Sequence, residues 1–190
     1  MKKRVLYTCA GGDLVLPAQA SLLADRQDGG NLLANPPRRV WERSVLSVAE
    51  LTAWAHLVSA AGQAMLDTLP QLEGGCINYW EAGNWALNDE AEPKGPKIAR
   101  EHRNMHLHLI GRSRFATNPN HAWGESPAFP KYADRLTWSK EFAPFNADEC
   151  TAIVARTIDL LRTKFAMPDL PASQTCLACG YPTPPAGHGC

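Results

Sequence analysis

The side chains of this sequence that are best suited to chemistry lie in one short stretch, "EHRNMHLHLIGRS", at residues 101–113. The stretch holds three of the six histidines, and polar residues alternate with apolar ones along it. Successive side chains of an extended strand point to opposite faces of a sheet. The alternation therefore predicts a strand that turns three apolar residues toward a core: Met105, Leu107 and Leu109. Five polar residues would share the other face: Arg100, His102, Asn104, His106 and His108.

Two kinds of chemistry fit the pair His106 and His108. An imidazole can attack an electrophile such as phosphorus when an acceptor orients its other ring nitrogen. Alternatively, a His-x-His pair on a strand can direct two nitrogens at one metal ion. The metal interpretation needs a third ligand, and four residues are candidates: Glu101, His102, His121 and Glu125. An exposed strand that is merely rich in histidine is the weaker explanation, because neutral imidazoles side by side stabilise a sheet very little.

Two helices are predicted to flank this stretch. Ser47 and Glu50 form a capping box, and apolar residues then recur at helical spacing until Pro70 ends the segment. Asn146 and Glu149 form a second capping box, which opens a C-terminal helix.

Two further strands are predicted between these features. Residues 32–35 read as a short strand that Pro36 and Pro37 end, and "CINYWEAG" reads as an aromatic strand bounded by glycines. The segment "NDEAEPKGPK" is polar with two prolines, so we expect a loop. The element order predicts an α+β fold with a meander-like antiparallel sheet, one long helix and a C-terminal helix.

Length and composition favour one compact domain. The chain has 190 residues, which we divide into a domain at 1–166 and a Pro/Cys-rich tail at 167–190. Lys+Arg and Asp+Glu balance at 19 each, so no overall field attracts nucleic acid or an acidic membrane. No apolar run is long enough for a transmembrane helix, and the N-terminus does not read as a signal peptide. Six cysteines without an export signal favour a reducing compartment, so we expect a cytoplasmic protein.

The tail carries a possible zinc site. Its sequence "CLACGYPTPPAGHGC" supplies four candidate ligands at short spacing: Cys176, Cys179, His188 and Cys190. Such a site would be structural, because four protein ligands leave no open position on the ion. Free thiols and a redox pair are the alternatives for the same cysteines.

The sequence "NMHLHLIGRS" resembles the signature strand of the histidine-triad (HIT) superfamily, in which three histidines alternate with apolar residues. The preceding segments are similar to the family in order, so the resemblance covers about residues 20–115. It implies a HIT-like sheet and cleavage of nucleotides at the α-phosphate through a nucleotidyl-histidine intermediate. His106 matches the nucleophile, and His108 matches the histidine that contacts the phosphate oxygens. The resemblance implies no required metal, a nucleotide or nucleoside-phosphate substrate, and a homodimer.

The chain departs from the family pattern at the first triad position, where Asn104 replaces histidine. Asn104 can still donate and accept hydrogen bonds, so it is a candidate catalytic residue together with the two histidines. The resemblance also suggests five substrate-binding candidates: Arg100, His102, Asp25, Asn84 and Trp123. Arg100 would clamp phosphate, Asp25 would bind ribose or simply stabilise a turn, and Trp123 would cover the site or pack. A nucleotide-binding protein without catalysis and a metal-dependent enzyme are the alternatives.

Overall fold

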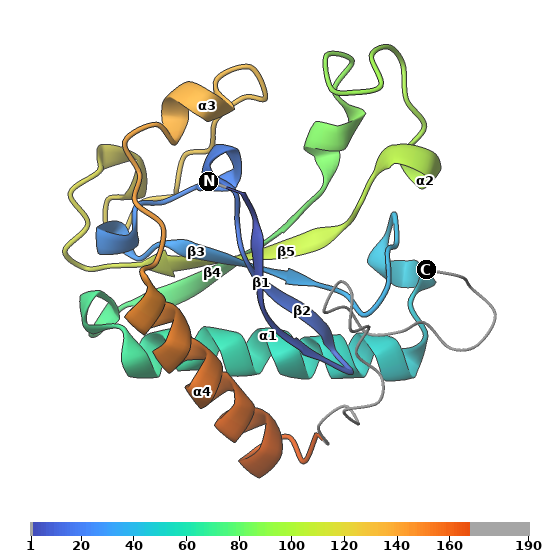
Figure 1. Ribbon diagram of the computed structural model, residues 1–190. Coiled ribbons are helices and arrows are strands. Elements are labelled where there is room, and N and C mark those ends of the chain that lie inside the picture. Colours follow the sequence, from blue (N-terminus) through green and yellow to red (C-terminus); the bar gives the residue numbers. More distant parts are fainter. Residues whose placement is uncertain (1, 168–190) are drawn as a thin grey trace.

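The histidine-bearing strand lies inside a five-stranded antiparallel sheet (Figure 1). The computed structural model describes residues 2–167 of the chain. The strands are β1 (Arg4–Cys9), β2 (Gly12–Leu16), β3 (Asn31–Asn35), β4 (Cys76–Ala82) and β5 (His106–Arg112). Their order across the sheet is β1-β2-β3-β5-β4, so β5 is hydrogen-bonded on both sides. The predicted α+β class is confirmed, and so are the predicted strands at β3, β4 and β5.

Two long helices cover one face of the sheet (Figure 1). They are α1 (Val48–Thr68) and α4 (Ala147–Thr163), and each begins with the capping box predicted for it. The main core lies between these helices and the sheet, where Leu57, Leu109 and Ile153 are completely buried. Leu107 and Leu109 of β5 therefore point toward the helices, as the alternation predicts.

The shorter helices lie in the connections. They are α2 (Ala99–His102), α3 (Arg135–Trp138) and the 3-10 turns η1 (Gln19–Ser21), η2 (Arg26–Asp28), η3 (Arg43–Val45), η4 (Pro70–Leu72), η5 (Asn84–Leu87) and η6 (Pro119–His121). Connecting segments also form the layer on the side of the sheet opposite α1 (Figure 1). No helix of the described residues is long and apolar enough to cross a membrane.

The extent of the histidine strand differs from the prediction. The strand begins at His106, and residues 99–102 form the short helix α2, closed by a hydrogen bond from Arg103 N–H to Ala99 O of 2.9 Å. The expectation that Arg100 and His102 share a strand face with His106 is therefore wrong. Alternating apolar residues end at Met105, and the preceding Ala-Arg-Glu segment favours a helix. Residues 168–190, which hold all four candidate zinc ligands of the predicted tail, lie outside the described residues.

Candidate active site

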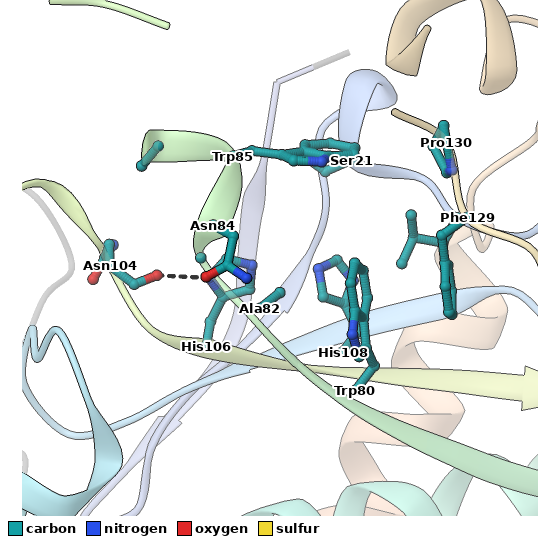
Figure 2. A pocket seen from close by; sticks show the side chains of 13 residues that line it. Ser21, Trp80, Ala82, Asn84, Trp85, Asn104, His106, His108, Phe129 and Pro130 are labelled. Carbon is teal, nitrogen blue, oxygen red and sulfur yellow. Dashed lines mark hydrogen bonds between the residues drawn. The ribbon is translucent and has the colours of Figure 1, made fainter. Parts of the chain in front are cut away.

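A cavity of about 370 Å³ lies on the face of the sheet opposite α1 (Figure 2). Two strands form its floor, since His108 of β5 is paired with Trp80 of β4, and His106 with Ala82. These side chains share a face because they alternate with Leu107 and Leu109, which point into the core. Connecting segments supply the walls, at residues 21–23, 83–86 and 129–130. The candidate nucleophile thus lies on a strand that is paired on both sides, at the floor of a partly open cavity.

The ring of His106 is held by a backbone carbonyl. His106 Nδ1 lies 2.9 Å from Asn104 O. A carbonyl oxygen only accepts hydrogen bonds, so Nδ1 carries the proton and donates it to Asn104 O. The other ring nitrogen, Nε2, then keeps its lone pair. His106 therefore has the form of a neutral nucleophile, with Nδ1 oriented by an acceptor.

The ring of His108 is held in the opposite tautomer. Leu23 N–H donates to Asn31 Oδ1 at 2.9 Å, which fixes the orientation of the Asn31 amide. Asn31 Nδ2 therefore faces His108 Nδ1 at 3.3 Å, and Nδ1 must accept. The proton of the neutral ring consequently lies on Nε2, and His108 is a hydrogen-bond donor at that atom.

Both imidazoles are kept uncharged. Burial, with a smaller contribution from the neighbouring His106 ring, lowers the pKa of His108 to about 3. Burial also lowers the pKa of His106, which the hydrogen bond to Asn104 O partly offsets. The two ring centroids are 5.1 Å apart. At neutral pH, His106 therefore offers a lone pair at Nε2, and the neighbouring His108 offers an uncharged N–H at Nε2.

The rest of the cavity is largely aromatic. Trp80 stacks on Phe129 with ring centroids 4.4 Å apart, and the centroid of the His108 ring lies 5.5 Å from that of Trp80. Trp85 forms the opposite wall (Figure 2) and has an edge contact with Tyr132. Apart from the two histidines, no titratable side chain lines the cavity within the described residues. Such walls suit a planar, uncharged group such as a nucleobase.

Two of the other predicted site residues lie at this cavity. Asn104 and Asn84 are both exposed and line its rim on the side of His106 (Figure 2). Their side-chain amides can donate to or accept from a ligand that enters there. Asn104 also contributes the carbonyl that orients His106, so its backbone has a role that its side-chain type does not determine.

The remaining predicted residues lie elsewhere. Arg100 lines a separate hollow, and His102 lies 3.9 Å from Glu101 Oε2 in α2. Asp25 caps η2, since its carboxylate accepts hydrogen bonds from Gln27 N at 2.8 Å and Ala143 N at 2.6 Å. Trp123 is 44% exposed and does not line the cavity.

None of the four candidates for a third metal ligand lines the cavity that holds the histidine pair. His121, one candidate, is fully buried and directs Nε2 at Leu23 O, 2.8 Å away. Within residues 2–167, no group of three or more His, Cys, Asp or Glu side chains is arranged to hold a metal ion.

Several residues of the site were missed from the sequence, among them Asn31, Trp80 and Phe129. Asn31 is a buried amide at the start of β3, and asparagine is unusual inside strands, so its position was a usable signal. Trp80 lies two residues before the end of β4, on the same face as Ala82. Phe129 comes from a long irregular segment, and no local pattern there predicts which residue reaches the site.

Comparison with known proteins gives no match: no protein-family model, no curated protein and no solved structure is similar to this chain.

Proposed function

We propose that this chain is a HIT-like nucleotide hydrolase or nucleotidyltransferase in which His106 attacks the α-phosphorus. The observation that carries the proposal is the pair of opposite tautomers, with the lone pair of His106 Nε2 beside the N–H of His108 Nε2. The resemblance of "NMHLHLIGRS" to the HIT signature supports the same chemistry. The aromatic walls of the cavity can hold the base of a nucleotide. The exposed side-chain amides of Asn84 and Asn104 at its rim can bind the phosphates.

The chemistry proceeds in two displacements. His106 Nε2 forms a bond to the α-phosphorus while the bond to the leaving group breaks, and the leaving group takes the electron pair. An amine leaving group also takes up a proton from water. The Nδ1 proton stays on the ring, where Asn104 O stabilises the positive charge that develops. Water or another acceptor then attacks phosphorus, displaces His106 and loses a proton.

His108 stabilises the charge on phosphorus in both steps. Its neutral Nε2–H donates to a non-bridging oxygen, and an uncharged donor costs less to bury than an imidazolium. The substrate class is a nucleoside phosphoramidate, a dinucleoside polyphosphate or a mixed nucleoside anhydride.

Native mass spectrometry of the purified chain, mixed with diadenosine tetraphosphate or adenosine phosphoramidate, tests this proposal. We expect a covalent gain of one nucleotide that is absent in His106→Ala and present in His102→Ala. His102 is the matched control, because it is a nearby histidine that does not line the cavity. Turnover that survives in His106→Ala would exclude this mechanism. The same spectra count the chains, which tests the expected homodimer.

Two other results would point to the alternatives. Nucleotide binding without turnover of either substrate favours a non-catalytic binding protein. A metal ion that is lost when both His106 and His108 are replaced favours the metal-dependent enzyme. That alternative needs His108 to give up its Nε2 proton and the Asn31 hydrogen bond to rearrange.

A further inference from the structure

A second hollow, of about 350 Å³, lies between α2 and the segment that follows β3. Four arginines line it: Arg38, Arg39, Arg100 and Arg103. Trp41 and Glu101 also line it, and the Arg100 guanidinium lies 5.8 Å from the centroid of the Trp41 ring. We call this site the arginine hollow.

The four arginines differ in how their charge is balanced. Arg38 pairs with Glu50 at 2.7 Å, and Arg103 pairs with Glu42 at 2.8 Å. Arg39 and Arg100 have no carboxylate partner among the described residues: Arg39 donates to the backbone oxygen of Glu101 at 3.2 Å, and Arg100 contacts the Trp41 ring.

Glu101, the acid that lines the arginine hollow, directs its carboxylate at His102 instead, 3.9 Å away. Two exposed arginines from separate segments, Arg39 and Arg100, therefore line one hollow without a carboxylate partner among the described residues.

The arginine hollow adjoins the candidate active site. Arg103 lines the hollow, and the next residue, Asn104, lines the rim of the cavity. The segment that connects α2 to β5 is thus a wall shared by both sites. Arg103 and Asn104 are consecutive, so one short segment contributes to both sites.

The two sites differ sharply in charge. The cavity has no cation among its described lining residues, and both its imidazoles are neutral, so it offers nothing to balance a chain of several phosphates. Guanidinium groups bind phosphate oxygens through paired, charge-assisted hydrogen bonds, and an indole face stacks on bases.

We propose that the arginine hollow binds the phosphates beyond the α-phosphorus of a nucleotide whose first base occupies the cavity. Arg39 and Arg100 contact the phosphate oxygens, and Trp41 offers its ring to the second base of a dinucleoside polyphosphate. This inference rests on the function proposed above. It selects polyphosphate-bridged substrates over substrates with a single phosphorus.

Steady-state kinetics with two substrates tests the inference. For Arg39→Gln/Arg100→Gln, we expect kcat/KM to fall at least about tenfold for diadenosine tetraphosphate and less than about twofold for adenosine phosphoramidate. Arg114→Gln removes an exposed arginine outside the hollow and should leave both values unchanged. An equal loss for both substrates, or no loss for either, would overturn the inference.

A binding measurement separates failure of this inference from failure of the proposed function. Calorimetric titration of full-length His106→Ala with inorganic tripolyphosphate needs no turnover. We expect binding that the additional Arg39→Gln/Arg100→Gln change weakens at least about tenfold, and that Arg114→Gln leaves intact. If neither substrate turns over but this pattern holds, the proposed catalysis fails and the phosphate site stands. Undetectable tripolyphosphate binding, or equal binding in all variants, would overturn the site itself.

Discussion

At the scale of single residues, Asn31 decides which nitrogen of His108 carries the proton. Its amide is held by Leu23 N–H, so its NH₂ group faces the ring. A buried histidine without such a partner could exchange between tautomers, and part of its population would then present a lone pair to the phosphate.

Replacing Asn31 by leucine, which has a similar shape, should remove the hydrogen bond that selects one tautomer of His108. We expect long-range ¹H–¹⁵N spectra to show both tautomers of His108, whereas His106 keeps its proton on Nδ1 and acts as an internal control. The unpartnered Leu23 N–H should also lower the free energy of unfolding by about 1–3 kcal/mol. A single, unchanged His108 tautomer in the variant would show that Asn31 does not determine it.

The buried histidines also make stability depend on pH. The folded-state pKa of His108 is about 3, against 6.5 for the ordinary group, and burial lowers the pKa of His121 as well. Below about pH 6.5 the unfolded chain binds protons that the folded chain does not, so stability is complete above that pH and is lost as pH falls toward 3.

Chemical denaturation at pH 8 and pH 5 measures this effect. His108 alone should contribute a loss of about 2 kcal/mol between these values. In His108→Phe the loss should shrink by that amount, whatever the absolute stability of the variant. An identical pH dependence in the two proteins would contradict the low pKa of His108.

At the scale of elements, the correct predictions are those that depend on short-range sequence patterns. Both capping boxes and the helical periodicity predicted α1 and α4, and the alternation around Leu107 and Leu109 predicted which face of β5 is buried. The hairpin of β1 and β2 was missed, since a bulge between Val5 and Tyr7 interrupts the period of two on which strand recognition depends.

The candidate site was predictable to the same degree. His106, His108, Asn104 and Asn84 are brought to one cavity, and the first three lie in or beside one strand. Arg100 was misplaced because a helical turn, and not a strand, precedes Asn104. Phe129 and Pro130 reach the cavity through tertiary contacts of a long segment, and sequence spacing holds no information on such contacts.

Arg112 holds the loop that follows β5. It is buried, donates to Asn78 Oδ1 at 2.9 Å, and donates to the backbone oxygens of Ala122 and Glu125, each at 2.9 Å. We expect Arg112→Met to cost about 2–4 kcal/mol of unfolding free energy, because buried carbonyls lose a charged donor.

Hydrogen exchange should quicken at residues 119–125 in this variant. The matched control is Arg114→Met, at an exposed position two residues further on, where we expect a change within about 0.5 kcal/mol. Unaltered exchange at 119–125 in Arg112→Met would mean that other contacts hold the loop.

At the scale of the whole molecule, the two faces of the sheet differ: one packs against the main core, and the other forms the floor of the cavity. The main apolar core lies on the side of α1 and α4, and the cavity lies on the other side. Core substitutions on the helix side should therefore change stability without changing the ligand site.

Ile153→Ala tests this separation. Ile153 of α4 is completely buried against the core, so its truncation should cost about 2–5 kcal/mol. Val48→Ala at the start of α1, where the side chain is 83% exposed, should stay within about 0.5 kcal/mol. Below the unfolding temperature, tripolyphosphate affinity should be the same in both variants. A weaker affinity in Ile153→Ala alone would show that the two faces are coupled.

The origin of the cavity walls has an evolutionary consequence. The imidazole pair belongs to a central strand whose partners on both sides restrict substitution, whereas Trp85, Phe129 and Pro130 come from connecting segments. Connections tolerate insertions and replacements far better than paired strands do. Descendants of this chain can therefore acquire new ligand preferences by changing their connections while they inherit the same pair of histidines.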